Sequence, residues 1–388
     1  MLRRAVPLAL AVALAGAAAP PEPATPDSGA PAAPPEPAAP DSGAPAAPVA
    51  AASAAKPRPG AFSWFALPVI FWLPETRLGY GATGGIHFHL AGAPRTSSLF
   101  LVGAYTLNGQ GSADVAGDVY LRNGMLLAGR VRLVHFPDAF YGLGSTSPTS
   151  AREPYTRRWA QGIFSAELPI LAGRLRAGPR LDLRGEDIRG LRPGGLLASG
   201  TVEGADGFSA VGLGASAAWD TRDRPLFPRS GSFLQAWYLH YPEAIGRHRE
   251  FAAANVEGRI FIPLGAERVL GAAAFVEEAF GDPPFTLLPK LGSTRFLRGW
   301  REGRFRDRAA WAAQTELRVP IWSRITGTAF GALGDVAPDL ASLRADTIKI
   351  AGGVGLRYRL TPEGANIRLD VAESRAGPEI YLLVLDAF

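Results

Sequence analysis

The stretch Arg174-Leu-Arg-Ala-Gly-Pro-Arg-Leu-Asp-Leu-Arg184 decides how the rest of the chain is interpreted. Side chains of a β-strand alternate between its two faces, so Arg176, Arg180 and Asp182 share one face and Leu181 shares the other with its neighbouring apolar residues. Strands of about ten residues with alternating polarity, separated by turns, are typical of a transmembrane β-barrel whose polar face lines the lumen. Residues 349–360 and 366–371 repeat the pattern.

The same alternation recurs from residue 62 to the C-terminus and predicts an all-β fold, an up-and-down antiparallel transmembrane barrel of about sixteen strands. The predicted strands are 62–73, 76–90, 98–107, 113–122, 125–136, 157–171, 174–188, 208–221, 231–242, 248–264, 267–280, 309–321, 325–337, 348–360, 365–374 and 379–388. With the N-terminus in the periplasm, the long connections 137–156, 189–207, 281–308 and 338–347 all fall outside, where such barrels carry their longer loops. Aromatic residues near strand ends are expected to form interfacial girdles: Trp64, Trp72, Tyr80, Trp237, Tyr241 and Trp322.

Composition excludes several classes of protein. The 388 residues contain no cysteine, which removes disulfides, thiolate metal sites, cysteine nucleophiles and a lipidated cysteine. The net charge of +5 is modest and the arginines are spread over many segments, so we expect no nucleic-acid partner. After residue 19 there is no apolar run of the roughly 20 residues that a membrane-spanning helix requires.

The N-terminal 60 residues differ from the rest of the chain. Residues 1–19 combine a charged start at Arg3 and Arg4, a short apolar run and a small-residue end, which predicts a secretory signal peptide. Residues 20–60 are almost entirely Pro, Ala, Ser, Gly, Asp and Glu and contain a direct repeat, which predicts a disordered linker because no core can be buried. The expected domains are therefore the signal peptide, the linker and a barrel over 61–388.

The connection between the eleventh and twelfth predicted strands carries the most specific motif. It is too charged for a strand, yet it contains Leu297-Arg298-Gly299-Trp300. This motif resembles the Arg-Gly-aromatic motif in the sixth outside loop of the BamA/TamA-like superfamily of outer-membrane assembly and translocation barrels, also called bacterial surface antigen barrels. Phe140-Tyr-Gly-Leu-Gly144 is also similar, and the resemblance covers about 62–388.

The resemblance implies that loop 281–308 folds into the lumen and that Arg298 pairs with carboxylates of the inner wall. Glu316 and Asp335 match the acidic residues of strands twelve and thirteen, and strand alternation predicts that both point inward. The alternative is that these are ordinary lumen charges in no fixed pair. Phe388, at the end of an amphipathic last strand, resembles the C-terminal assembly signal of outer-membrane barrels.

The leading functional hypothesis is a bacterial outer-membrane barrel that assists insertion or translocation of polypeptides, or of lipids, through a weak seam between its first and last strands. Members that handle protein clients carry periplasmic POTRA modules, whereas the linker holds that place here. The alternative is a passive pore or a structural outer-membrane protein without a client. Expected partners are outer-membrane lipid and, by resemblance, unfolded outer-membrane or secreted proteins and periplasmic accessory proteins.

No catalysis is expected from the sequence. The five histidines, His87, His89, His135, His240 and His248, form no recognisable triad or metal-binding motif. Two ligands on one strand face, His87 and His89, are too few for a metal site. We therefore expect neither a metal nor another cofactor.

Overall fold

The computed structural model describes residues 62–224, 226–360 and 365–384. The predicted signal peptide, the linker and Phe388 lie outside these residues. Within the described part, none of the helices has the length and apolar character needed to cross a membrane.

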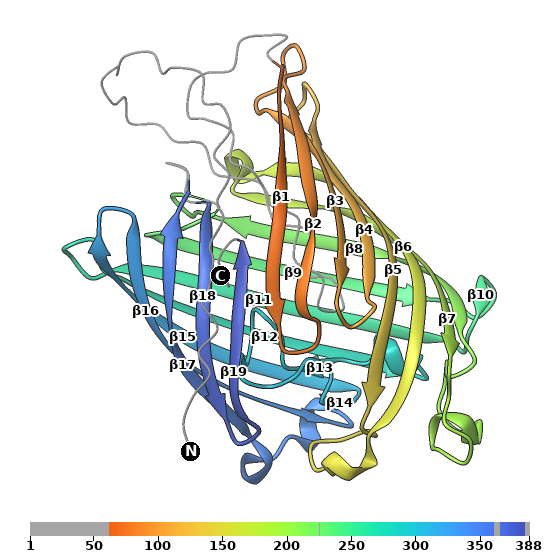
Figure 1. Cartoon of the computed structure of the whole chain (residues 1–388). Coiled ribbons are helices and arrows are strands. Elements are labelled where there is room, and N and C mark those ends of the chain that lie inside the picture. The colour runs from red at the N-terminus through yellow and green to blue at the C-terminus, as the bar shows by residue number, and fades with distance from the viewer. Residues whose placement is uncertain (1–61, 225, 361–364, 385–388) are drawn as a thin grey trace, which may run out of the picture. The chain divides into compact units, whose positions relative to one another are not determined.

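Sixteen long antiparallel strands close into a barrel, which confirms the predicted fold (Figure 1). They are β1 (Phe62–Leu73), β2 (Arg77–Phe88), β3 (Ser97–Thr106), β4 (Gly111–Tyr120), β5 (Leu126–Phe140), β6 (Glu153–Ile170), β7 (Leu175–Arg189), β8 (Phe208–Asp220), β9 (Gly231–Tyr241), β11 (Phe251–Pro263), β12 (Val269–Gly281), β15 (Ala309–Trp322), β16 (Ile325–Ala337), β17 (Lys349–Arg359), β18 (Asn366–Ser374) and β19 (Gly377–Val384). Three two-residue strands were not predicted, because two residues carry no alternation: β10 (Gly246–Arg247), β13 (Lys290–Leu291) and β14 (Phe305–Arg306).

The barrel wall is polar inside and apolar outside. On β5, Arg130 and Arg132 are buried, whereas Val131 and Leu133 are 44% and 57% exposed. The buried arginines are paired across the wall, and Arg132 Nε lies 3.0 Å from the Asp114 carboxylate of β4. A lumen of paired charges within an apolar outer surface is the reverse of a soluble sandwich and suits a hydrocarbon surround.

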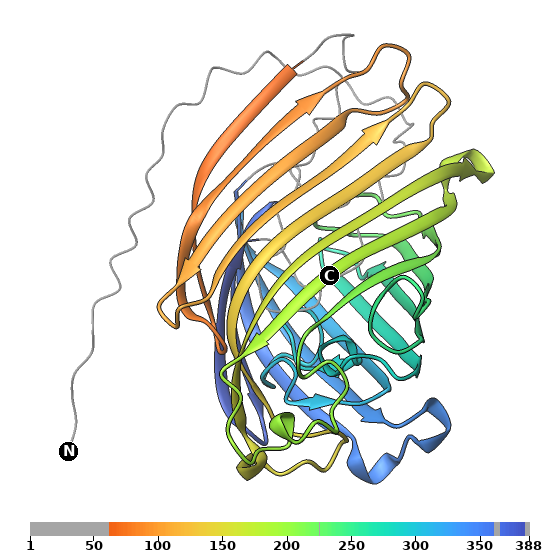
Figure 2. The same cartoon turned by 90° about the vertical axis from the view of Figure 1, so that its right-hand side faces the viewer.

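The two ends of the barrel differ. The long connections 141–152, 190–207, 282–308 and 338–348 gather at one end, at the bottom of Figures 1 and 2, which we call the loop end. Short connections such as 171–174 and 323–324 lie at the opposite end. Phe140, Tyr155 and Phe285 pack edge to face at the loop end, with ring centroids 5.3–5.4 Å apart for the two pairs that Phe285 makes. Connection 282–308 is therefore packed against the loop-end termini of β5 and β6.

The predicted aromatic girdles are correct for part of the set. Trp64 and Trp322 are 71% and 76% exposed on the outer surface. Tyr241 is buried on the lumen face of β9, where its hydroxyl donates to Asp182 at 2.8 Å. Trp237 lies on the same face and receives the Arg180 guanidinium at 5.5 Å. Both residues lie at odd-numbered positions of β9, which face the lumen. Their closeness to a strand end, on which the girdle prediction is based, does not show which face they occupy.

Neighbouring strands are joined very unequally around the ring. β5 and β6 are paired from Leu126↔Glu167 to Phe140↔Glu153. Over the described residues, β1 and β19 are paired at a single position, Trp72↔Leu382. We call this β1–β19 junction the seam.

Candidate functional site

Residues 282–308, which we call the lumen loop, leave β12 and return to β15, the eleventh and twelfth strands of the barrel. Its base is a small antiparallel ladder in which Lys290 pairs with Arg306 and Leu291 with Phe305. The Gly303 N–H also donates to the Leu291 carbonyl at 3.0 Å. The ladder turns the tip of the loop into a compact unit that can dock as one piece.

The apolar side chains of the tip are buried against the inner wall. Phe296, Leu297 and Trp300 share a core cluster with small wall residues from β12, β15, β16 and β17, namely Ala273, Ala310, Ala312, Ala332 and Ala351. Alanines at these positions leave the space that the larger loop side chains fill, as close-packed interiors require. Burial of one such large side chain contributes about 1.5–3 kcal/mol. The lumen is therefore apolar where it receives Phe296, Leu297 and Trp300.

Backbone geometry explains the glycine of the motif. Gly299 has φ +105°, a conformation that side chains disfavour. A Cβ added there would lie 3.3 Å from the Glu373 backbone and 3.4 Å from the Ala351 Cβ. The residue next to the wall must therefore be glycine, which lets Arg298 reach past it.

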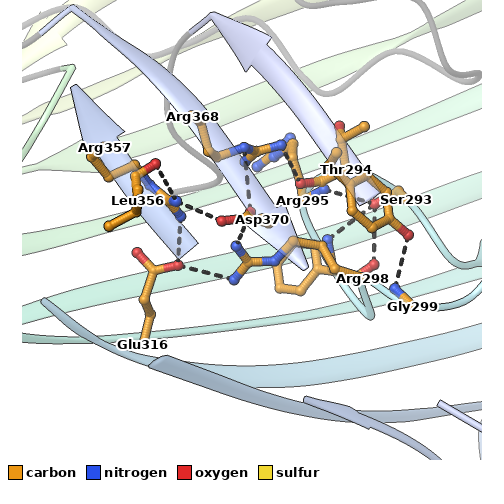
Figure 3. A network of polar contacts seen from close by, with 12 residues as sticks. Ser293, Thr294, Arg295, Arg298, Gly299, Glu316, Leu356, Arg357, Arg368 and Asp370 are labelled. Carbon is orange, nitrogen blue, oxygen red and sulfur yellow. Dashed lines mark hydrogen bonds and ion pairs between the residues drawn. The ribbon is translucent and has the colours of Figure 1, made fainter. Parts of the chain in front are cut away.

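Arg298 is fully buried and its guanidinium joins two strands (Figure 3). One nitrogen donates to Asp370 of β18 at 2.6 Å, and the other donates to Glu316 of β15 at 3.0 Å. The guanidinium carbon also lies 3.5 Å from the centroid of the Phe330 ring. The rigid fork of an arginine suits this double recognition of carboxylates, which a lysine could not reproduce.

The two carboxylates also hold three wall arginines. Arg357 donates to Glu316 at 3.1 Å and to Asp370 at 2.5 Å. Arg318 lies 3.1 Å from Glu316, and Arg368 lies 3.5 Å from Asp370. Without Arg298 the wall would still carry one more cation than it has acids in this group. Arg298 therefore docks into a site whose carboxylates are already oriented by the wall.

The prediction that Asp335 pairs with Arg298 is wrong. Asp335 accepts hydrogen bonds from Ser145 and Thr347 of the outer connections, and Lys349 lies 3.8 Å from it. Alternation along this strand predicts that its apolar residues face lipid and that Asp335 faces the lumen. In the structure Phe330 is among the inward residues, because this part of the lumen face packs against the loop.

Asp370 is the functional carboxylate that sequence reasoning missed. It is fully buried on the lumen face of β18, with Arg368 two residues before it. A signal was present, because residues 366–371 alternate and place Arg368 and Asp370 on the polar face. Nothing in that alternation relates β18 to a loop 72 residues earlier in the chain.

The tip of the lumen loop contacts both sides of the seam. On the β19 side, the Gly299 N–H donates to the Tyr381 hydroxyl at 2.8 Å, and the Ser374 hydroxyl of β18 donates to the Gly299 carbonyl at 2.6 Å. On the β1 side, the Glu302 N–H donates to the carboxylate of Glu75 in the β1–β2 turn at 2.7 Å. Side chains and loop backbone thus span the junction, at which the described residues form one β-pairing.

Glu75 is the titratable part of this bridge. Burial raises the pKa of its carboxyl from the usual 4.5 to about 7, and the hydrogen bond from the Glu302 N–H opposes that rise. The bridge between the loop and the β1–β2 turn therefore changes charge near neutral pH.

A comparison with protein families agrees with the loop motif, with its position between the eleventh and twelfth strands, and with the strand pattern. Residues 128–378 match the Omp85 superfamily domain. The chain belongs to the Omp85 superfamily. Among curated protein sequences, none matches this Omp85 chain.

Solved structures show the same Omp85 fold. The structure of BamA from Haemophilus ducreyi lacking POTRA domains 1–3 has a TM-score of 0.57 at 15% identity, covering 84% of this chain and 70% of that one. CdiB from Escherichia coli gives 0.56 at 12% identity, covering 85% and 63%. CdiB from Acinetobacter baumannii gives 0.51 at 10% identity, covering 83% and 59%. This Omp85 chain thus spans less than two thirds of either CdiB chain.

Proposed function

We propose that this Omp85 protein lies in the bacterial outer membrane with its loop end outside, where it assists insertion or translocation of polypeptides without a catalytic step. Its expected clients are unfolded outer-membrane or secreted proteins, and accessory periplasmic proteins are further candidate partners. Superfamily membership and the apolar outer surface of the barrel support this role.

The single observation that carries the proposal is the seam. Each unpaired backbone group of a strand edge costs several kcal/mol in hydrocarbon, so a nearly unpaired junction is a poor design for a passive barrel. A client strand can satisfy the free N–H and carbonyl groups of β1 by pairing with them. Among the described residues β1 has one pairing to β19 and a complete ladder to β2, so the edge of β1 that has few described partners faces the seam.

The lumen loop disfavours the passive-pore alternative. Its tip fills space inside the barrel and is tied to β15, β17, β18 and β19 by Arg298, Trp300 and Gly299. A pore built this way should conduct poorly while the loop is docked. We expect low conductance for the intact chain in planar bilayers, and a higher value after the tip is removed.

The deciding experiment measures how fast an unfolded reporter barrel inserts into liposomes that contain the purified protein. Empty liposomes and liposomes with an unrelated barrel of similar size are the controls. We expect insertion faster than with either control. Equal rates in all three, together with high conductance, would replace the proposal with a pore.

A further inference from the structure

The wall of the barrel has a step at the loop end. At the loop end β4 begins at Gly111, which pairs with His135, whereas β5 continues five residues further to Phe140, where β6 is its one partner among the described strands. On the other side, β19 begins at Gly377, well beyond its pairing with β1 at Trp72↔Leu382. The β1–β2 and β3–β4 turns therefore stop short of their neighbours, as Figure 2 shows for the orange hairpins.

A polar cavity of about 490 Å³ lies at this step. It is lined by Glu75 and Arg77 of the first hairpin, Gln110 of the second, Asp138 and Arg152 at the outer ends of β5 and β6, and Arg301 of the lumen loop. The cavity is thus built from four separate parts of the chain. Its lining is mostly polar, unlike the outer surface beside it.

The acids Asp138 and Glu75 accept hydrogen bonds from the protein, whereas the side chains of two of the three arginines of the cavity have no hydrogen bond or ion pair among the described residues. Asp138 accepts hydrogen bonds from the Tyr155 hydroxyl at 3.1 Å and from the Ala139 N–H at 2.8 Å, and Glu75 accepts one from the Glu302 N–H. The side chains of Arg77 and Arg152 make no hydrogen bond or ion pair with any described residue.

Arg301 has one ion pair, to Asp138 at 3.6 Å, and its Nε is buried without a hydrogen-bond partner. Glu379 of β19 lies near Arg77 but makes no ion pair with it. Three guanidiniums with unused donors around one polar cavity match an oxyanion with several acceptor oxygens.

We propose that this cavity binds the phosphate group of an outer-leaflet lipid. Arginine recognises phosphate bidentately, and the position of the cavity selects the lipid source. A tilted strand needs about 9–11 residues to cross the hydrocarbon layer, and β1 to β4 have 10 to 12. Their outer turns therefore end at headgroup level, and the cavity lies at the height of these turns. This inference rests on the proposed membrane placement with the loop end outside.

The test measures binding to the full chain in detergent by native mass spectrometry, which is independent of insertion activity. The probes are a phosphorylated glycolipid, its dephosphorylated form and inorganic phosphate. The variant Arg77→Gln/Arg152→Gln/Arg301→Gln is compared with Arg189→Gln/Arg249→Gln/Arg344→Gln, which changes arginines at other exposed sites of the loop end. Arg152→Gln alone serves as the variant that leaves every described contact intact.

We expect the phosphorylated glycolipid to bind and its dephosphorylated form to bind about tenfold more weakly, since one lost charge-assisted contact is worth about 1.4 kcal/mol or more. The cavity triple variant should lose the preference, the control triple should keep it, and Arg152→Gln should weaken it. Equal binding by both triple variants would overturn the proposal. Competition by millimolar inorganic phosphate at full strength would reassign the cavity to a soluble anion.

Discussion

The β5–β6 joint and the seam solve the same problem, holding two neighbouring strands together, in different ways. The β5–β6 joint is a continuous ladder of backbone pairs from one end of β5 to the other. The seam has one described backbone pair, and the lumen loop lies across it with contacts to Tyr381 on one side and Glu75 on the other. Two strands joined by a continuous ladder separate only when all of its backbone hydrogen bonds are lost. A few contacts made by one loop are lost when that loop moves.

This difference assigns the lumen loop a role beyond filling space. Arg298 ties the tip to β15 and β18, and Gly299 and Glu302 extend the tie to β19 and to the β1–β2 turn. We infer that the docked loop favours the closed seam. Each of the following changes alters the seam while leaving the β5–β6 ladder as an internal reference.

The largest expected effect comes from locking the seam with a disulfide. The chain has no cysteine, so Trp72→Cys/Leu382→Cys can form only the intended bond between directly opposite residues. We expect oxidation to abolish acceleration of reporter-barrel insertion and reduction to restore it. The matched control, Leu133→Cys/Ala160→Cys within the β5–β6 ladder, should insert normally when oxidised. Full activity of the locked seam would refute a lateral opening.

Arg298→Ala should give the largest loss of stability. It removes two charge-assisted hydrogen bonds of about 1.5–3 kcal/mol each, although Arg357 still donates to both Glu316 and Asp370. We expect a lower fraction of folded, heat-modifiable barrel and faster proteolysis within residues 292–304. Arg344→Ala, which removes an exposed arginine paired with Asp346, should leave both readouts unchanged. Normal protease resistance of Arg298→Ala would show that Arg298 does not hold the lumen loop against the wall.

Neutral isosteres of Asp370 and Asp335 test which of these two carboxylates pairs with Arg298. Asp370→Asn should reproduce most of the Arg298→Ala phenotype, at about 3 kcal/mol in urea unfolding, because it removes the negative charge and leaves one acceptor oxygen for Arg298 and Arg357. Asp335→Asn should instead loosen the outer connections near Ser145 and Thr347 and leave the loop tip protected from protease. If Asp335→Asn exposed residues 292–304 and Asp370→Asn did not, the described pairing would be incorrect.

The pH dependence of the bridge depends on Glu75. Its pKa is raised in the folded protein, so the protonated form is favoured there, and the resulting stability is complete below about pH 4.5 and lost as the pH rises to about 7. The neutral variant Glu75→Gln should therefore be more stable than the parent above pH 7, by up to about 3 kcal/mol, and should converge with it near pH 4.5.

Urea unfolding between pH 4.5 and pH 7.5 measures this difference. Glu267→Gln, in the exposed β11–β12 turn, is the control and should follow the parent at every pH. A parent and a Glu75→Gln variant that respond identically to pH would remove Glu75 from the bridge.

Tyr381→Phe should have the smallest effect. It removes the acceptor for the Gly299 N–H and leaves the ring in place, which costs about 1 kcal/mol. We expect faster hydrogen exchange at Gly299 and a small shift of the unfolding midpoint. Tyr358→Phe, on the exposed outer face of β17, should change neither.

Alternation along single strands was sufficient to predict the barrel, since each strand reports its own two faces. It failed at β16, where the sequence rule that apolar residues face lipid assigned Asp335 to the lumen. The lumen face of β16 is itself apolar at Phe330, because the loop packs there. Asp370 was missed for the related reason that its partner, Arg298, is distant in sequence and reaches it only after the loop folds inward.

By itself, the sequence determined the strands, the order of long and short connections, and the slot and glycine of the loop motif, because these depend on neighbouring residues and on backbone conformation. Only the tertiary structure decided which carboxylates hold Arg298, which described residues pair across the seam, and where three arginines meet at the step in the wall. Those features depend on how the strands are staggered around the closed barrel and on the path of one loop through its lumen. The residues that such contacts bring together are not spaced regularly along the chain, so no sequence pattern predicts them.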